Sequence, residues 1–332
     1  LAPHRFHGTA LRAISLALVR ALNDRGDIGV TARPDPSQIG PGGGDRRDDS
    51  ATLRFVIDVA RVARRRTLAS GDRVDPDRGI NHPAHERIKT YSPLRRGEPV
   101  RKDRIDRYLH WLNRHPGRRV DVALGPATPP GDAVVDYLIT ENKPWMVYAQ
   151  FANTGTETTG EWRQRAGFIH NQLTGHDDVL SIDAATSSFN GTHSVNASYE
   201  RPMPFAPRLR LRAFGGFSEF EAEDVAVFNI DFDGEQQWFG VDARWNFLQR
   251  GPLFLDLHAG LRYQSIEVNN RTAAVAGEDD FLLPHVGLGL ERQTDVADSS
   301  AMVDLAFNAP GAVGTDEQTL FQLGREDVEE DF

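Results

Sequence analysis

Apolar and polar residues alternate along much of the chain after Trp145. In the segment QQWFGVDARWNF, Phe239, Val241 and Ala243 fall on one face of an extended strand, and Asp242 falls on the other. The segments PRLRLRAFGGF and GPLFLDLHAGLRY repeat the pattern. Alternation over ten or more residues predicts long strands with one dry face and one wet face. Strands in globular sheets usually have about five or six residues, whereas a tilted strand crosses a bilayer in about nine to eleven.

Short polar segments separate the alternating stretches. We expect turns at QLTGHDD, FNGTH, LQRGP and AGEDD, which join neighbouring strands into an antiparallel meander. This pattern predicts eight or nine strands between Trp145 and Phe307. Aromatic residues fall near the expected strand ends, where an interfacial girdle would place them: Trp145, Tyr148, Trp162, Tyr199, Trp238 and Tyr263.

The first 144 residues mix helical and extended patterns. Leu11, Ile14, Leu18 and Leu22 recur at helical spacing, and Gly26 follows as a stop signal. The segment LRFVIDVARVARRRTLA then alternates as a strand would. Further along, HPAHERIKTYSPL and VRKDRIDRYLHWLNRHPGR predict two helices, and RRVDVALGP and AVVDYLITE predict two strands. We therefore expect two small α+β modules, residues 1–79 with an incomplete start and residues 80–144.

Composition narrows the classes of function. The 332 residues contain no cysteine, which excludes disulfides, thiolate zinc sites and cysteine nucleophiles. The longest helical apolar stretch, AISLALVRAL, is too short to span a bilayer as a helix. Residues 1–145 hold 26 Lys and Arg against 18 Asp and Glu, although the whole chain has a net charge of −10. Scattered arginines without interleaved aromatics favour a solvated surface over nucleic-acid binding.

Candidate catalytic and cofactor motifs are weak. His176 to Asp178 form an HDD motif, but they fall in an expected hairpin turn, where Asp serves local hydrogen bonds. His82 and His85 have metal-ligand spacing, yet no third ligand is evident. The PGGGD segment lacks the Lys-Ser/Thr of a nucleotide-binding loop. We expect no enzyme activity, no catalytic residue, no metal and no cofactor.

A row of arginines on one strand face is the strongest polar feature. Arg208, Arg210 and Arg212 share a face that cannot point into lipid, since each charge would cost several kcal/mol near the midplane. They must face a lumen or partner carboxylates. One interpretation is a charged channel wall that handles an extended polypeptide. The other is an internal salt-bridge layer with inward-facing aspartates, for which the candidates are Asp183, Asp242 and Asp256.

Two motifs carry a resemblance to a known family. After LNRHPGRRVDV and the ENKPW linker, the chain has the pattern N-x-G-x-x-x-x-G-x-x-R, formed by Asn153, Gly155, Gly160 and Arg163. The second motif, N-Q-L-x-G-x-D-D-x-L-S-I, contains Asn171, Leu173, Gly175, Asp177 and Leu180. Together they resemble the ShlB/FhaC/HecB family of haemolysin secretion/activation proteins, the two-partner secretion transporters of the Omp85 superfamily. The resemblance covers about residues 100 to 205.

The resemblance implies a fold and a function. The α+β modules would be periplasmic POTRA modules, and residues 145–332 would form an antiparallel transmembrane β-barrel in the outer membrane. The modules would capture an unfolded, β-rich secreted partner by adding it as a strand to a sheet edge, and the barrel would conduct it outward. The implied partners are that polypeptide and outer-membrane lipid, with no nucleic acid.

The sequence departs from the family pattern in its later part. The family barrel has sixteen strands, of which about half can be placed here. The segment LGREDVEEDF does not alternate, and no Arg-Gly-aromatic loop motif is found, so we expect a truncated barrel. Two other hypotheses stay open: an Omp85-type assembly factor that inserts other barrels, and a soluble β-rich enzyme or binding protein with a packed core.

Overall fold

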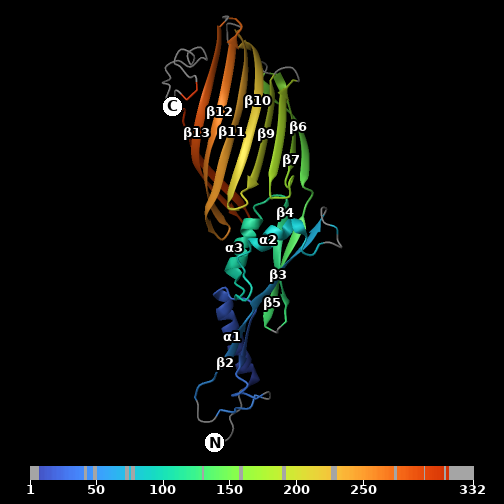
Figure 1. Ribbon diagram of the computed structural model, residues 1–332, viewed down its shortest axis with the longest axis vertical. Helices are drawn as coiled ribbons and strands as arrows, with labels where there is room; N and C mark the ends of the chain where they lie inside the picture. The colour runs from blue at the N-terminus through green and yellow to red at the C-terminus, as the bar shows by residue number, and fades with distance from the viewer. Residues whose placement is uncertain are drawn as a thin grey trace. The chain divides into compact units, whose positions relative to one another are not determined.

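The computed structural model divides the chain into two compact units, Leu1–Asn142 and Lys143–Phe332. Figure 1 shows helices and short sheets in the first unit and long strands in the second. The structure describes residues 7–40, 43–47, 51–71, 75, 79–128, 131–156, 160–188, 192–225, 230–272, 275–294, 296–309 and 312–313. Among these residues, no helix combines the length and the apolar character that a membrane crossing requires.

The first unit contains two small sheets and several helices. Its elements are α1 (Gly8–Asp24), β1 (Val30–Pro34), β2 (Phe55–Val59), β3 (Arg61–Gly71), the 3-10 helix η2 (Pro83–His85), α2 (Glu86–Thr90), α3 (Lys102–Leu112), β4 (Arg118–Pro126) and β5 (Asp132–Glu141). Strands β1 and β2 form an antiparallel pair. The other sheet has the order β3-β5-β4, with β3 parallel and β4 antiparallel to β5.

Aromatic residues organise the main core of the first unit. Tyr137 on β5 is only 1% exposed, and its hydroxyl lies 2.5 Å from the Ser92 hydroxyl. Its ring meets the Tyr108 ring of α3 edge-on, and Tyr108 donates a hydrogen bond of 2.7 Å to the Ile88 carbonyl. Burial raises the pKa of Tyr137, because the charged phenolate would lose its hydration. Tyr137 and Tyr108 together thus join helices α2 and α3 to the sheet.

The long alternating segment after Leu53 is two strands, where one was predicted. Strand β2 ends at Val59 and β3 begins at Arg61, with buried Ala60 between them. The Ala60 amide bonds the Gly29 carbonyl, while the Ala60 carbonyl accepts from Val100, so the chain passes there from one sheet to the other. The β3-β5-β4 sheet contains strands from both sides of the expected module boundary at residues 79 and 80, and the division into two modules stays a prediction.

The second unit is one antiparallel meander of nine strands. The strands are β6 (Trp145–Thr156), β7 (Gly160–His170), β8 (Val179–Ser187), β9 (His193–Pro202), β10 (Leu209–Val225), β11 (Ile230–Arg250), β12 (Leu253–Asn270), β13 (Val275–Gln293) and β14 (Asp298–Ala306). Each pairs with its neighbours in sequence, in the order β14 to β6. The described strands confirm the predicted meander of eight or nine.

Strand lengths and one turn differ from the prediction. Strands β10 to β13 have 17 to 21 residues, about twice the expected nine to eleven. The AGEDD segment, expected as a turn, lies inside β13, where Ala276 pairs with Asn269 and Asp280 with Ser265. The acidic residues belong to strands that continue far beyond their apolar part. The FNGTH segment falls partly outside the described residues.

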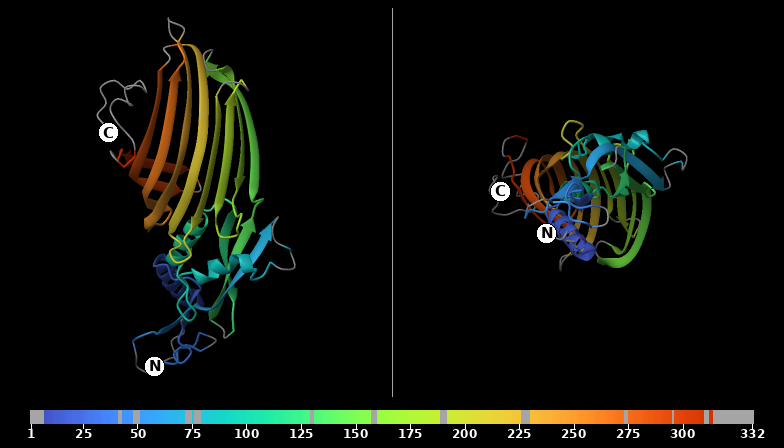
Figure 2. Two further views of the ribbon diagram at one scale, coloured as in Figure 1. Left: turned by 45° about the horizontal axis from the view of Figure 1, so that its top comes forward. Right: turned by 90° about the horizontal axis from the view of Figure 1, so that it is seen from below.

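The sheet has two chemically different faces and curves like a trough (Figure 2). We call the face that contains Val241 and Ala243 the outer face, and the face that contains Asp242 and Arg244 the inner face. On the inner face, four rings lie over glycines of the neighbouring strand, so close that a Cβ at each glycine would stand 2.3 to 2.7 Å from the ring. The pairs are Tyr148 over Gly167, Trp238 over Gly216, Phe214 over Gly240 and Phe220 over Gly234. The prediction that Tyr148 and Trp238 belong to an interfacial girdle is therefore wrong, because their alternation directs both side chains to the inner face.

Candidate functional site

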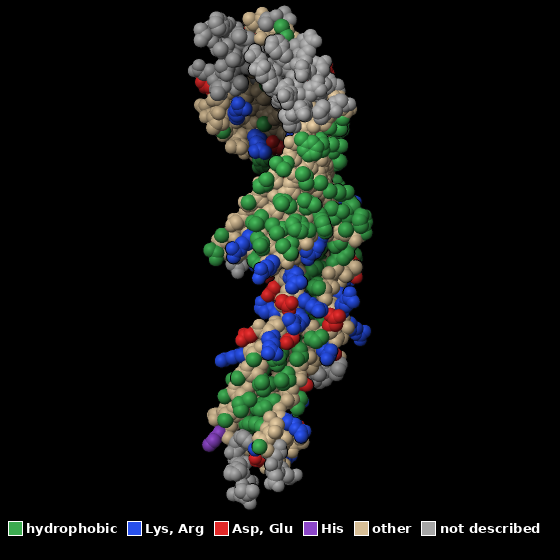
Figure 3. Space-filling model, turned by 90° about the vertical axis from the view of Figure 1, so that its left-hand side faces the viewer, with side chains coloured by type: hydrophobic (Ala, Val, Ile, Leu, Met, Phe, Trp, Pro, Cys, Tyr) green, Lys and Arg blue, Asp and Glu red, His purple; other side chains and the backbone are tan. Residues whose placement is uncertain are grey.

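An apolar band covers the outer face over the half of the long strands nearest the turns at residues 171–178, 203–208 and 251–252. One cross-strand row runs through five strands and is apolar throughout: Leu211, Ala243, Ala259, Val286 and Leu305. These side chains are not packed against protein, and Val241 beside them is 60% exposed. Figure 3 shows the band as an area of hydrophobic side chains.

The height of this band matches a bilayer. On β11 it runs from Phe239 to Leu248, which is about 30 Å along a strand that rises about 3.3 Å per residue. A tilt of about 40° reduces this to about 23 Å, close to the band of about 25 Å on outer-membrane barrels. We call the strand ends at residues 171–178, 203–208 and 251–252 the near end of the unit, and the opposite ends the far end.

Beyond the band, towards the far end, the outer face becomes acidic. Four glutamates stand side by side on four neighbouring strands, in the row Glu219, Glu235, Glu267 and Glu278. The next row contains Glu221 and Asp233. Arg271 bonds both carboxylates, at 2.8 Å and 2.6 Å respectively. Meanwhile the inner face of this part becomes apolar, with Phe281 and Leu283 buried against Ile266. The far part therefore has the polarity of a sheet surrounded by water.

The inner face at the level of the band carries a charged network. Glu200 on β9 accepts a hydrogen bond of 2.6 Å from Arg244 on β11 and another from Arg210 on β10. Beside it, Arg212 lies 3.7 Å from an Asp242 carboxylate oxygen, and His285 Nε2 on β13 lies 3.0 Å from the other. The network joins strands β9 to β13 and places five charged side chains and one imidazole on one wall.

The arginines and aspartates that the sequence predicted to face inward make several side-chain contacts. Arg208 donates hydrogen bonds from its guanidinium to Asn246 at 2.8 Å and to Gln249 at 3.0 Å. Asp256 accepts a bond of 2.8 Å from Asn246, and Asp183 accepts bonds from Tyr148 and Arg165. Of the predicted arginine–aspartate pairs, the described residues contain Arg212 with Asp242.

The network has three members that sequence reasoning missed. Glu200, Arg244 and His285 each occupy a polar position of an alternating strand, which was the available signal. Their meeting depends on register, since Glu200 pairs across from Arg212 and Arg212 pairs across from Asp242. Register follows from turn geometry and strand length, and the strand lengths were underestimated.

Neutralising Glu200 is expected to destabilise the sheet. In the Glu200→Gln variant, Arg210 and Arg244 keep their charges but lose the carboxylate between them, at an expected cost of about 1–3 kcal/mol. The free energy of unfolding, measured by urea titration in detergent micelles, would show the loss.

The matched variant Glu235→Gln is expected to change stability in the opposite direction. Glu235 stands directly between Glu219 and Glu267, and like charges opposite each other destabilise a sheet by about 0.2–1 kcal/mol. Equal effects of the two Glu→Gln variants would contradict the assignment of Glu200 as a bridge between arginines.

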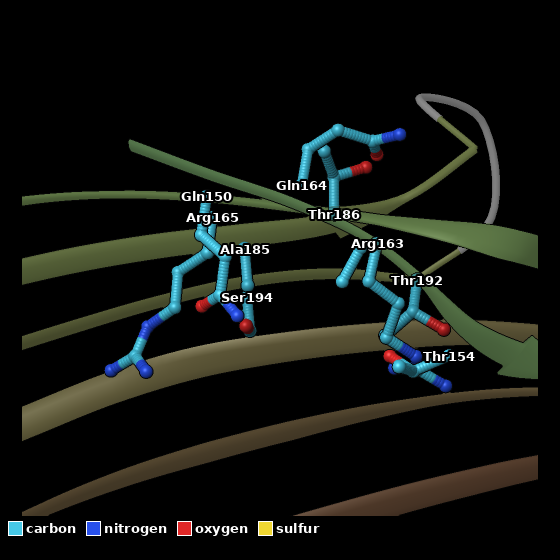
Figure 4. A pocket seen from close by; sticks show the side chains of 10 residues that line it. Gln150, Thr154, Arg163, Gln164, Arg165, Ala185, Thr186, Thr192 and Ser194 are labelled. Atoms are coloured by element: carbon cyan, nitrogen blue, oxygen red, sulfur yellow. The ribbon is translucent and has the colours of Figure 1, made fainter. Parts of the chain in front are cut away.

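The first family motif lies at the β6–β7 hairpin. Asn153 pairs with Trp162 just before a register shift, and a Cβ at Gly155 would stand 1.9 Å from the Gly160 carbonyl oxygen, so only glycine fits there. Gly160 itself has a φ of +90°. Arg163 lines a polar pocket of about 210 Å³ with Arg165, drawn in Figure 4, whose other lining residues are Gln150, Ala152, Thr154, Gln164, Ala185, Thr186, Thr192 and Ser194.

The second family motif forms the turn between β7 and β8. The Asn171 amide bonds the Pro144 carbonyl at 2.7 Å, and Gly175 has a φ of +74°. Fully buried Asp178 accepts bonds from the Thr174 amide and hydroxyl and from the His176 amide. Asp177, with a φ of +61°, accepts a bond of 2.9 Å from Gln172. The HDD motif thus serves a turn, as the sequence predicted.

The Asp178→Asn variant is expected to weaken this turn in a pH-dependent way. Burial alone would raise the pKa of Asp178, but hydrogen bonds from Thr174 and His176 hold it below the ordinary value of about 4. A lowered pKa contributes stability that is present above pH 4 and is lost as the pH falls through the folded-state value. We expect Asp178→Asn to cost about 1–3 kcal/mol at pH 7 and less at pH 3, by urea titration in micelles.

The control for this variant is Asp177→Asn. Asparagine tolerates a positive φ as well as aspartate does, and its amide oxygen can accept the bond from Gln172. A cost for Asp177→Asn as large as for Asp178→Asn would contradict the role given to Asp178.

Comparison with known proteins finds a family model that is similar to part of the chain. Residues 131–268 match the family model described as "Haemolysin secretion/activation protein ShlB/FhaC/HecB". The chain is 24% identical over 174 residues to the hemolysin transporter protein ShlB of Serratia marcescens, an alignment that covers 52% of this chain and 31% of that protein. It is 28% identical over 130 residues to the outer membrane transporter CdiB of Dickeya dadantii, covering 38% and 23%.

Solved structures share the fold of this chain. CdiB from Escherichia coli superposes with a TM-score of 0.62 at 16% identity, covering 94% of this chain and 55% of that one. CdiB from Acinetobacter baumannii gives a TM-score of 0.53 at 14% identity, covering 92% and 54%. The fold class is therefore α+β modules followed by part of an antiparallel transmembrane β-barrel. The chain spans less than a third of the length of the curated relatives named above.

Proposed function

We propose that the protein is an outer-membrane polypeptide transporter of two-partner secretion. The observation that carries the proposal is the division of one sheet into an apolar outer band about one bilayer high and a charged inner wall. A lipid-facing surface needs the first, and a wet passage for an extended chain needs the second. Similarity to relatives that are named as transporters, one of them a hemolysin transporter, supports a polypeptide as the class of cargo.

The proposal assigns a role to each part of the chain. Residues 145–332 lie in the outer membrane, against its lipid, and contribute a wall of the passage. Residues 1–79 and 80–144 act as periplasmic POTRA modules that capture an unfolded, β-rich secreted polypeptide. Arg210, Arg212 and Asp242 face the passage. The protein binds no nucleic acid and catalyses no reaction, so it needs no cofactor.

A single-cysteine scan tests the membrane placement. Because the chain has no cysteine, each introduced thiol is unique. Glu235→Cys, beyond the band at the far end, should react with a membrane-impermeant maleimide on intact cells. Phe205→Cys, 82% exposed in a near-end turn, should react only after the outer membrane is permeabilised. Val241→Cys should stay protected in both cases, and its labelling on intact cells would contradict a lipid-facing band.

A chimera tests transport. Residues 131–268 would replace the matching segment of the Serratia marcescens hemolysin transporter, and secreted haemolysin would be measured in the culture medium. We expect secretion above that of a transporter-free strain. Heat-modifiable electrophoretic mobility would verify that the chimera is folded in the outer membrane. A folded chimera that secretes nothing would contradict the transport assignment.

A further inference from the structure

Two arginines lie at the near-end border of the apolar band. Arg250 is the last residue of β11, and Arg292 is next to last on β13. Both pair with Leu253 of the strand between them, so all three occupy one row on the outer face. Neighbouring strands are about 4.8 Å apart, which places the two arginine Cα atoms about 10 Å from each other.

Neither guanidinium is used by the fold. Both side chains are exposed, and neither has a hydrogen bond or ion pair with any residue that the structure describes. The neighbouring Glu291 lies on the inner face, where it accepts a bond of 2.6 Å from Gln293. Three other arginines of the unit differ in this respect, since Arg210, Arg244 and Arg271 are each held by carboxylates.

An apolar column begins next to this pair and runs towards the far end. The next row towards the far end is Leu248, Leu255 and Leu290, and the row after it is Trp245, Leu257 and Leu288. Trp245 and Leu288 are 50% and 54% exposed. This surface has two cations at the near end, followed by two rows of apolar side chains. It matches a molecule with an anionic headgroup and acyl chains.

The opposite border of the band has the opposite charge. There the apolar side chains of Phe239 and Tyr263 are followed by Gln237 and Ser265, and then by the row of four glutamates. An anionic headgroup would be repelled at that border and attracted at the near end. The preference therefore belongs to one leaflet, the one at the near end.

We propose that Arg250 and Arg292 bind the phosphate of an anionic phospholipid of the phosphatidylglycerol type, with its acyl chains on the column of Leu248, Leu290 and Trp245. This proposal rests on the proposed function, since it requires the band to face lipid. A guanidinium donates paired hydrogen bonds to phosphate oxygens, and each basic residue near a membrane surface strengthens the attraction to anionic lipid. The site would fix the depth of β11 to β13 in the bilayer.

Fluorescence quenching at Trp245 tests the proposal. The full chain would be folded into phosphatidylethanolamine vesicles that contain an equal fraction of either dibrominated phosphatidylglycerol or dibrominated phosphatidylethanolamine. Bromine quenches tryptophan at contact, and the Trp245 signal is the difference between the chain and its Trp245→Phe variant. We expect phosphatidylglycerol to be preferred around Trp245 by roughly three- to tenfold, and the preference to fall in high salt.

The double variant Arg250→Gln/Arg292→Gln should abolish this preference without changing the circular dichroism of the sheet. The control is Arg119→Gln, an exposed arginine on β4 of the first unit, which should leave the preference unchanged. Equal quenching by the two brominated lipids, or a preference that survives in the double variant, would overturn the headgroup site alone. Absence of quenching by either lipid would show that Trp245 does not face lipid, and would overturn the proposed function as well.

Discussion

Replacing Ala243 with arginine is expected to prevent stable insertion of the second unit into lipid. Ala243 lies in the middle of the outer band on β11, with Ala259 of β12 and Leu211 of β10 on either side. A guanidinium at this depth of a bilayer costs about 2–4 kcal/mol on the lipid face of a barrel. Urea titration of vesicle-folded protein, followed by heat-modifiable mobility, would measure the loss.

The matched control lies on the same face of the same strand. Gln237 is exposed on the outer face six residues away, beyond the band and beside the acidic rows. Gln237→Arg should cost less than about 1 kcal/mol, since the charge stays near or outside the interface. If Gln237→Arg proved as harmful as Ala243→Arg, the cost would come from the sheet itself, and the band would not be the lipid contact.

The second large effect is expected in the first unit. Tyr137→Ala would remove the largest fully buried side chain of the chain's described part, and cavities of this size in a core cost about 3–5 kcal/mol. It would also remove the hydrogen bond between the Tyr137 and Ser92 hydroxyls, leaving Ser92 only the bond that it accepts from the Leu94 amide. Hydrogen–deuterium exchange of the full chain in micelles should show loss of protection across β3, β4 and β5, while β10 to β13 keep theirs.

The adjacent residue supplies the control. Leu138 directly follows Tyr137 on β5 but points to the opposite face of the sheet and is 38% exposed. Leu138→Ala should leave exchange in β3 to β5 close to that of the unaltered chain. Tyr137→Phe, which keeps the ring, should cost about 1 kcal/mol. Comparable deprotection by Leu138→Ala and Tyr137→Ala would contradict the core described around Tyr137.

Alternation predicted the type and order of the strands well, because burial of one face leaves a mark at every second residue. It underestimated the length of β10 to β13, since the outer face beyond Phe239 turns acidic and the inner face turns apolar. The same inversion made the AGEDD segment resemble a turn. A pattern defined by an apolar outer face ends where lipid ends, although the strand continues.

The polar site was predictable only in part. Arg208, Arg210 and Arg212 stood out as three charges on one predicted strand face, although Arg208 lies in the turn just before β10, and the partners of all three lie on other strands. Glu200 meets Arg210 and Arg244 only because β9, β10 and β11 pair in a particular register. The segment from Leu53 to Ala69 shows the same limit in the first unit. Its alternation is continuous, and the change of sheet at Ala60 depends on contacts with Gly29 and Val100 that local sequence does not contain.

In the proposed transporter, the glycines beneath the inner rings would set the clearance of the passage. Because Gly216 has no side chain, Trp238 lies flat against β10, and Gly240, Gly234 and Gly167 do the same for Phe214, Phe220 and Tyr148. Each ring therefore lies against the neighbouring strand and does not project away from the sheet. A methyl group at any of these glycines would push a ring away from the sheet. If the proposed function holds, the width available to a transported chain would therefore depend on the smallest residues of the sheet as much as on its largest.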